Sequence, residues 1–336
     1  MAVSDRREVC LSDGQAVAVA AAAAPPAAEL AALVDEARGY ADAQRSEGTW
    51  AAYRRDWQAF EAWCAERTLE ALPAAPATVA LYVTVRARSD HPTTIGRRLA
   101  AIAAAHDRAG WPSPTRDRRV AGVVRGVRRR LGVGPRRQVA PAVTAELRRM
   151  VEACPDRLIG TRDRAVLLLG FAAALRRSEL VALDVEDLEE RDEGLVVTVR
   201  RSKTDQEGAG HVVGVPYGSH PATCPVRAVR AWRQAAGIDT GPLFRPIDRH
   251  GAMRPQRLRG ADVAGVVKRA AARAGLDPDR YAGHSLRSGL ATAAAAGGAS
   301  ERAIMAQTGH RSLPTVRRYI RRGGLFDDNA AARAGL

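Results

Sequence analysis

The stretch LVVTVRRSKTDQEGAGHVVGVPYG, residues 195–218, differs from the rest of a chain whose apolar residues recur mostly at steps of three and four. In its first part Leu195, Val197 and Val199 alternate with residues of the opposite face, and a polar loop leads to a second β-prone run at 211–218. Alternation on both sides of a glycine-containing loop is typical of a β-hairpin. The sequence therefore predicts a mainly helical protein with one small antiparallel sheet.

The polar loop of this hairpin contains an unusual cation. The chain has 52 lysines and arginines, and only Lys203 and Lys268 are lysines. Arginine stays protonated at any ordinary pH, whereas a lysine can be tuned to release its proton. Lys203, at the end of a strand that can project it from a rigid support, is therefore a candidate for acid–base chemistry. The alternative is chance retention, since Lys268 has the character of an ordinary helix-surface residue.

The charge balance indicates the class of partner. Lysine and arginine exceed the 37 acidic residues, which gives a formal net charge of +15. Such a balance favours nucleic acid first and anionic membrane surfaces second. No stretch is apolar and long enough to span a bilayer, and no signal peptide is evident. We therefore expect a cytoplasmic, nucleoid-associated protein that binds no membrane.

The four cysteines are Cys10, Cys64, Cys154 and Cys224, and no two of them form a CxxC pair. This spacing predicts neither a disulfide framework nor a zinc site. We expect reduced, partly buried thiols.

Composition divides the chain into four segments. Residues 1–35 are rich in alanine and poor in large apolar side chains, so we expect a disordered tail. Residues 36–131 have helical periodicity throughout, and 132–141 has the two glycines and two prolines of a linker. Residues 142–336 form a second domain, which contains the hairpin.

The first domain combines an aromatic stripe with a basic surface. The stripe consists of Trp50, Tyr53, Trp57 and Phe60, and its helical spacing favours a core position over base stacking. Between residues 92 and 141 there are 12 arginines and two acids. A nearly pure basic run favours phosphate contact, although a solvated face is the alternative. The candidate DNA-binding residues are Arg97, Arg98, Arg128, Arg129, Arg130, Arg136, Arg137 and, beside the hairpin loop, Arg201.

Two motifs of the second domain have the character of phosphate ligands. In ALRRSEL an apolar helix turns polar at Arg176, which Glu179 can orient for bidentate contact with an oxyanion. In HSLRSG, His284 and Arg287 lie three residues apart at a helix start and hence on one face. A structural ion pair and a chance spacing, respectively, are the alternatives for each motif alone.

The third motif is TGHRSLPTVRRY. Gly309 is expected to end one helix, His310 to lie in the turn, and Pro314 to stand in the first turn of the next helix. That helix carries Tyr319, nine residues after His310. A tyrosine among arginines can also be ordinary surface packing.

Together, and in this order, the motifs and the hairpin lysine resemble the tyrosine recombinase, or phage integrase, family. The resemblance implies a helical, SAM-like core-binding domain and a mixed α+β catalytic domain that form a C-shaped clamp around DNA. Three positions depart from the family pattern. Ala174 stands where a glycine is common, Arg177 adds a second cation, and Ser288 stands where another histidine is frequent.

The resemblance also implies a reaction. Tyr319 would attack the phosphodiester and form a 3′-phosphotyrosine, while Lys203 protonates the departing 5′-oxygen. Arg176 and Arg287 would bind the non-bridging oxygens. The DNA would hold inverted-repeat core sites on which a homotetramer assembles.

The remaining roles follow from the same resemblance. His284 would assist proton transfer, His310 would hydrogen-bond the phosphate, and Glu179 would support the site. The covalent link stores the bond energy, so neither ATP, a metal nor another cofactor is implied. Three alternatives remain: a type IB topoisomerase, a DNA-binding protein with a decayed site, and a metal-dependent nuclease, for which we find no suitably grouped acids.

Overall fold

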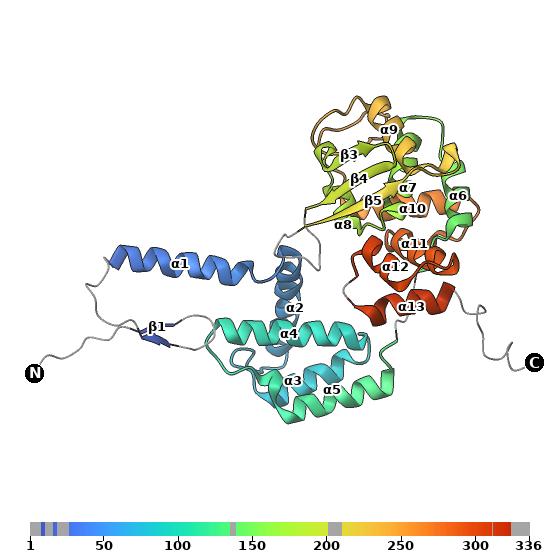
Figure 1. Cartoon of the computed structure of the whole chain (residues 1–336). Coiled ribbons are helices and arrows are strands. Elements are labelled where there is room, and N and C mark those ends of the chain that lie inside the picture. Colours follow the sequence, from blue (N-terminus) through green and yellow to red (C-terminus); the bar gives the residue numbers. More distant parts are fainter. Residues whose placement is uncertain are drawn as a thin grey trace, which may run out of the picture. The chain divides into compact units, whose positions relative to one another are not determined.

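The structure is a computed structural model, and the chain divides into two compact units, residues 1–136 and 137–336 (Figure 1). It describes residues 8–10, 16–18, 27–134, 139–200, 210–310 and 312–323. The predictions for Lys203, Arg201, Arg136 and Arg137 lie outside the described residues.

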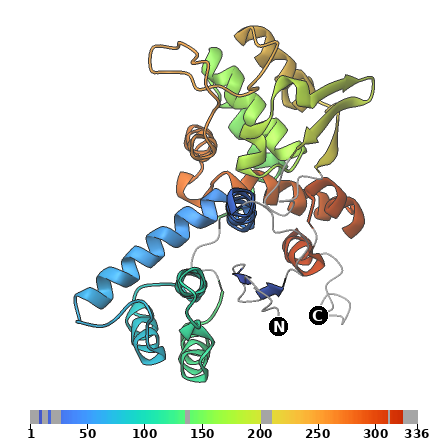
Figure 2. The same cartoon turned by 90° about the vertical axis from the view of Figure 1, so that its left-hand side faces the viewer.

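The first unit is a helical bundle with a short N-terminal hairpin. Its strands are β1 (Glu8–Cys10) and β2 (Ala16–Ala18), and its helices are α1 (Ala27–Ala43), α2 (Glu47–Ala65), α3 (Pro76–Arg86), α4 (Pro92–Arg108) and α5 (Arg118–Leu131), with a 3-10 turn at Pro114–Arg116. Helix α2 packs on α4, and α3 packs on α5 (Figures 1 and 2).

Within residues 1–35, for which the sequence predicts a disordered tail, the structure describes three segments, 8–10, 16–18 and 27–35. They contain both short strands and the first half of α1. The physical reason for the helix is propensity rather than burial, because alanine is the best helix former and α1 is rich in it. Large α1 side chains remain exposed, with 53% of Leu33 and 70% of Tyr40 accessible.

The aromatic stripe of α2 belongs to the core of the first unit. Phe60 is fully buried and contacts Tyr82 edge-on, while Trp57 is half-buried. Helix α2 begins as its cap chemistry requires, because the Ser46 hydroxyl accepts a hydrogen bond from the amide of Thr49. The core prediction is therefore confirmed most clearly at the C-terminal end of the stripe.

The second unit is mixed α+β. Its elements are α6 (Thr144–Glu152), α7 (Leu158–Ala172), α8 (Arg177–Ala182), β3 (Leu188–Arg191), β4 (Gly194–Val199), β5 (His211–Pro216), α9 (Pro225–Ala236), α10 (Gly260–Arg273), α11 (His284–Ala296), α12 (Glu301–Thr308) and α13 (Leu313–Gly323), with 3-10 turns at Val185–Asp187, Pro221–Thr223 and Pro278–Arg280. The apolar α7 is buried on most sides and packs against α9, α10 and α11.

The predicted hairpin is confirmed. Strand β4 lies between β3 and β5, and both pairings are antiparallel. Leu195 pairs with Val215 and Val197 with Val213, and all four side chains are buried. The alternation in the sequence therefore marks the face of the sheet that contributes to the core.

Helices α11, α12 and α13 lie together at one end of the second unit (Figures 1 and 2). Ala291, Ile304 and Val316, one from each helix, form a small apolar cluster against which Tyr319 packs. Gly289 of α11 is required by space, because a Cβ atom there would lie 2.1 Å from the carbonyl oxygen of Ala142. Among the helices of the described residues, none has both the length and the apolar character needed to cross a bilayer.

Candidate active site

Arg176 is held by Glu179 at the turn between α7 and α8. The Arg176 side chain donates from Nη1 to Glu179 Oε1 at 2.6 Å, and its backbone amide donates to Oε2 at 2.8 Å. The carboxylate is buried, with 1% of its side chain exposed, whereas 19% of the Arg176 side chain is exposed. Two bonds to one buried carboxylate fix both the backbone and the guanidinium, so Glu179 orients Arg176.

The same turn connects the first arginine to the second. Ala174 adopts a left-handed conformation with φ 51°, which costs an L-residue about 1–2 kcal/mol. This conformation accounts for the frequent glycine noted at this position in the resembled family. The Ala174 carbonyl accepts a 2.8 Å hydrogen bond from Nη1 of Arg287, which lies 113 residues further along the chain.

Arg287 is a buried cation with unused donors. The residue is 2% exposed, and within the described part of the chain its Nε and Nη2 atoms have no hydrogen-bond partner. Burial, with the nearby charge of Arg176, lowers the pKa of Arg287 to about 10, so it is still protonated at pH 7. A buried charge with unpaired donors is costly, and an anion that accepts from those donors removes the cost.

His284 contacts the phenol of Tyr319. Helix α11 begins at His284, and its Nε2 lies 3.0 Å from Tyr319 Oη. Desolvation lowers the pKa of His284, and the charges of Arg287 and Arg176 lower it further, although part of the residue is exposed to solvent. The imidazole is therefore neutral at pH 7, and Nε2 can accept the phenolic proton when Nδ1 carries the ring proton.

Ser288, which replaces a frequent histidine of the resembled family, serves the helix rather than the phenol. Its hydroxyl donates to the carbonyl of His284 at 3.0 Å, one turn earlier, and the residue is 6% exposed. With serine at position 288, the imidazole that hydrogen-bonds Tyr319 among the described residues is that of His284.

His310 lies in the turn between α12 and α13. Gly309 ends α12 with φ 61°, as the sequence predicts, and the Ser300 side chain caps its start. The rings of His310 and Tyr319 are 5.8 Å apart between centroids. Burial, followed by the charges of Arg287 and Arg176, lowers the pKa of His310 to about 4. His310 is therefore neutral at pH 7 in the free protein.

Gln307 is a site-region residue that the sequence analysis missed. Its Nε2 donates to the carbonyl of Ala172 at 2.8 Å and to that of Gly214 at 3.0 Å. These bonds join α12 to the end of α7 and to strand β5, an edge strand of the sheet. The contacts span 135 and 93 residues of sequence. Local pattern therefore carries no signal for them.

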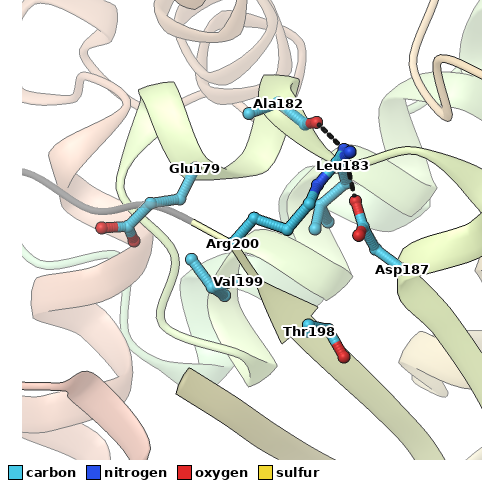
Figure 3. A pocket seen from close by; sticks show the side chains of 7 residues that line it. All are labelled: Glu179, Ala182, Leu183, Asp187, Thr198, Val199 and Arg200. Atoms are coloured by element: carbon cyan, nitrogen blue, oxygen red, sulfur yellow. Dashed lines mark hydrogen bonds and ion pairs between the residues drawn. The ribbon is translucent and has the colours of Figure 1, made fainter. Parts of the chain in front are cut away.

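A cleft beside Glu179 reaches the base of the hairpin (Figure 3). Arg200, directly after β4, forms ion pairs with Asp184 and Asp187 and donates to the carbonyl of Ala182. Figure 3 shows this side chain directed toward Asp187 and the Ala182 carbonyl. Arg200 is the last described residue before the loop, and these contacts tie it to the chain around α8.

The candidate DNA-binding arginines of the first unit fall into two groups. Arg128, Arg129 and Arg130 are exposed in the last turn of α5, where the helix dipole favours cations. Arg97 donates to both carboxylate oxygens of Asp56, at 2.7 and 3.2 Å, while 47% of its side chain remains exposed.

Arg98, also a candidate DNA-binding residue, is held inside the bundle. It donates from Nε to Asp90 at 2.7 Å and from Nη1 to the Tyr82 hydroxyl at 3.2 Å, and only 14% of its side chain is exposed. Asp56 forms a further ion pair with it. These contacts occupy the guanidinium inside the bundle and indicate a role in packing.

Five of the six predicted catalytic residues lie in the described part of the second unit, and their contacts connect them. Arg287 bonds the turn that carries Arg176, His284 bonds Tyr319, and the ring of His310 lies beside the ring of Tyr319. The site thus combines two cations, two neutral imidazoles and a phenol, which suits nucleophilic attack on a phosphodiester.

Comparisons with known proteins identify the class. A profile of the phage integrase family matches residues 143–323. The chain is 38% identical to an integrase/recombinase xerD homolog of Selenomonas ruminantium over 293 residues, 86% of each chain. It is 27% identical to recombinase cre of Escherichia phage P1, over 82% of this chain and 84% of that one. The chain therefore belongs to the phage integrase family, the tyrosine recombinases, which are site-specific DNA recombination enzymes.

Solved structures agree in fold. The Tn1549 transposon integrase in complex with transposon right end DNA has a TM-score of 0.58 and 14% identity, over 87% of this chain and 93% of that one. A lambda integrase dimer bound to a COC′ core site has a TM-score of 0.57 and 16% identity, over 87% and 94%. The predicted fold class, mainly helical with a small antiparallel sheet, is confirmed.

Proposed function

We propose that this recombinase cleaves and rejoins DNA through a 3′-phosphotyrosyl intermediate at Tyr319, without ATP or metal, and exchanges strands in a tetrameric synapse. The contact between Tyr319 and His284 carries the proposal. A phenol hydrogen-bonded to a neutral imidazole, beside a buried arginine with unpaired donors, is arranged for attack on an oxyanion.

The first step is activation of the nucleophile. Tyr319 attacks phosphorus as its O–H bond breaks, and Nε2 of His284 accepts the proton. Burial, and after it the positive charge of the neighbouring arginines, lowers the pKa of His284 and thus keeps it neutral. After cleavage the imidazolium can return the proton, which suits the reverse reaction.

The second step is stabilisation of the transition state. Arg287 offers Nε and Nη2 to the non-bridging oxygens, and Arg176 adds a second guanidinium already oriented by Glu179. These donors are in place before the substrate arrives, so little reorganisation is needed as charge develops.

Departure of the 5′-oxygen requires a proton, which we assign to Lys203. This residue lies outside the described residues, and the assignment rests on its place in the hairpin and on the family resemblance. The anchoring of Arg200 at the start of the loop supports it.

The DNA is double-stranded, with inverted-repeat core sites. Arg128, Arg129 and Arg130 of the first unit would bind phosphates, together with Arg97, and the two units would enclose the duplex. We assign phosphate contacts also to Arg136, Arg137 and Arg201, which the structure does not describe. The segment 325–336 would couple neighbouring protomers on DNA. We place the protein in the cytoplasm, on the nucleoid.

The test combines trapping with strand exchange. The full chain is mixed with genomic DNA in a metal chelator and denatured with SDS, the attached DNA is sequenced, and two copies of the recovered site are placed on one plasmid. We expect a chelator-resistant adduct and exchange between the sites. An adduct with relaxation but without exchange would favour a type IB topoisomerase, and the absence of any adduct would favour a DNA-binding protein without catalysis.

A further inference from the structure

Thr308 is the last residue of α12 and contacts His310. The proposed reaction gives Thr308 no role. The residue is 1% exposed. Its Oγ1 lies 2.6 Å from the carbonyl oxygen of Ile304 and 2.7 Å from Nδ1 of His310. One buried hydroxyl therefore has two partners at hydrogen-bond distance, and it has only one proton to donate.

The carbonyl decides where that proton lies. A carbonyl oxygen can only accept, so the 2.6 Å contact with Ile304 uses the hydroxyl proton. Reversing the bonds would leave two oxygen atoms 2.6 Å apart with no proton between them, which is repulsive. The Thr308 oxygen must then accept from Nδ1 of His310, which places the ring proton on Nδ1.

We propose that Thr308 is a positioning residue that fixes His310 as its Nδ1–H tautomer, so that neutral His310 presents a bare Nε2 to the active site. This inference rests on the proposed function, since it concerns how His310 meets the phosphate. A bare Nε2 and a phosphate oxygen both carry lone pairs, so they cannot bond. His310 therefore contacts the phosphate only after Nε2 takes up a proton from solvent.

The surroundings of His310 couple that proton to the DNA. The charged and titratable groups that act on His310 are Arg287 of α11, Arg176 before α8, His284 at the start of α11 and Arg318 of α13, and the phenol ring of Tyr319 lies beside it. The cations oppose an imidazolium in the free protein. A bound phosphate offsets their charge and accepts from Nε2–H, so it favours the protonated ring. Thr308 thus makes the contact between His310 and phosphate conditional on proton uptake.

The tautomer is measurable without DNA. Ring nitrogens of the full-length protein are labelled with 15N on histidine, and the His310 signals are assigned by their loss in His310→Gln. We expect a protonated Nδ1 and an unprotonated Nε2 in the wild type and in Thr308→Ser, which keeps the hydroxyl. In Thr308→Val, which keeps the shape without the hydroxyl, we expect the proton to move to Nε2. An Nε2–H ring in the wild type, or an unchanged ring in Thr308→Val, would overturn the proposal.

A second readout separates positioning from folding. Rates of adduct formation are compared over pH 5–9 in both Thr308 variants. In the Ser variant, as in the wild type, His310 must be protonated to bind the phosphate. Its contribution to the rate of adduct formation should therefore weaken as pH rises. The Val variant should lose that dependence on pH, because neutral Nε2–H donates at any pH. A uniform loss of rate at every pH would indicate a structural role only and would contradict the inference. The ring measurement needs no catalysis, so it stands or fails independently of the result for Tyr319.

Discussion

The hydroxyl oxygen of Tyr319 lies 3.0 Å from Nε2 of His284, although the two residues are 35 positions apart and belong to different helices. The phenol is thereby paired with a base before any DNA arrives. Burial holds the base neutral together with neighbouring arginines, two of which, Arg287 and Arg176, would also bind the phosphate. Phosphate binding and nucleophile activation thus depend on one arrangement of α8, α11 and α13.

Acid should destabilise the fold through the histidines of the site. The folded pKa of His310 is about 4 against an ordinary 6.5, so between these values the unfolded chain binds more protons. The free energy of unfolding should therefore fall as pH decreases from 6.5 to 4, by at most about 1 kcal/mol per pH unit after solvent screening. Urea titrations at several pH values measure it. His310→Gln should flatten the dependence of the unfolding free energy on pH, whereas His220→Gln, at an exposed histidine, should leave it unchanged. Equal slopes of unfolding free energy against pH in the two variants would refute this explanation.

Ala174→Gly should stabilise the second unit. Glycine adopts φ 51° without the Cβ penalty, and this gain exceeds the added entropy of the unfolded chain by about 0.5–1 kcal/mol. Its neighbour provides the matched control, because Ala173 has φ −84° and no strain to relieve. Thermal unfolding should show Ala173→Gly destabilised and Ala174→Gly stabilised, with the adduct rate preserved in the latter. Two losses of similar size would mean that the turn is not strained.

Gln307→Leu should impair catalysis while DNA affinity is retained. The change removes two hydrogen bonds that hold α12 against α7 and β5, at a cost of about 1–3 kcal/mol in unfolding free energy. Since α12 leads directly into His310, adduct formation should slow. Gln234→Leu, on the exposed side of α9, is the control. Wild-type adduct rates in a destabilised Gln307→Leu protein would show that the bridge serves folding alone.

How far sequence predicts structure in this chain depends on the range of the interactions. Ser300 and Gly309 delimit α12 by local chemistry, and the alternation from Leu195 to Val199 marks the sheet, so both could be predicted. The roles of Gln307 and Arg98 could not, because their partners lie in other elements. The first half of α1, residues 27–35, could not be predicted for a different reason, because it forms by alanine propensity without burying an apolar face.

Neutralising the basic end of α5 should weaken DNA binding and its salt dependence. Each phosphate contact releases condensed counterions, so replacing Arg128, Arg129 and Arg130 by glutamine should reduce the slope of log K against log salt by up to about 2.7. Fluorescence anisotropy over a salt series gives the slope. Arg98→Gln is the control, since that side chain is buried in ion pairs and should alter stability but not the slope. An unchanged slope in the triple variant would show that these three arginines contact solvent and not DNA phosphates.

The account as a whole depends on a covalent bond between Tyr319 and a DNA 3′-phosphate. Adducts formed in chelator are digested with protease and nuclease, and the modified peptide is sequenced by mass spectrometry. We predict that the nucleotide is attached to Tyr319 through its 3′-phosphate, and that Tyr319→Phe binds DNA as the wild type does without forming an adduct. A nucleotide attached to any other residue, or an adduct that persists in Tyr319→Phe, would contradict the account.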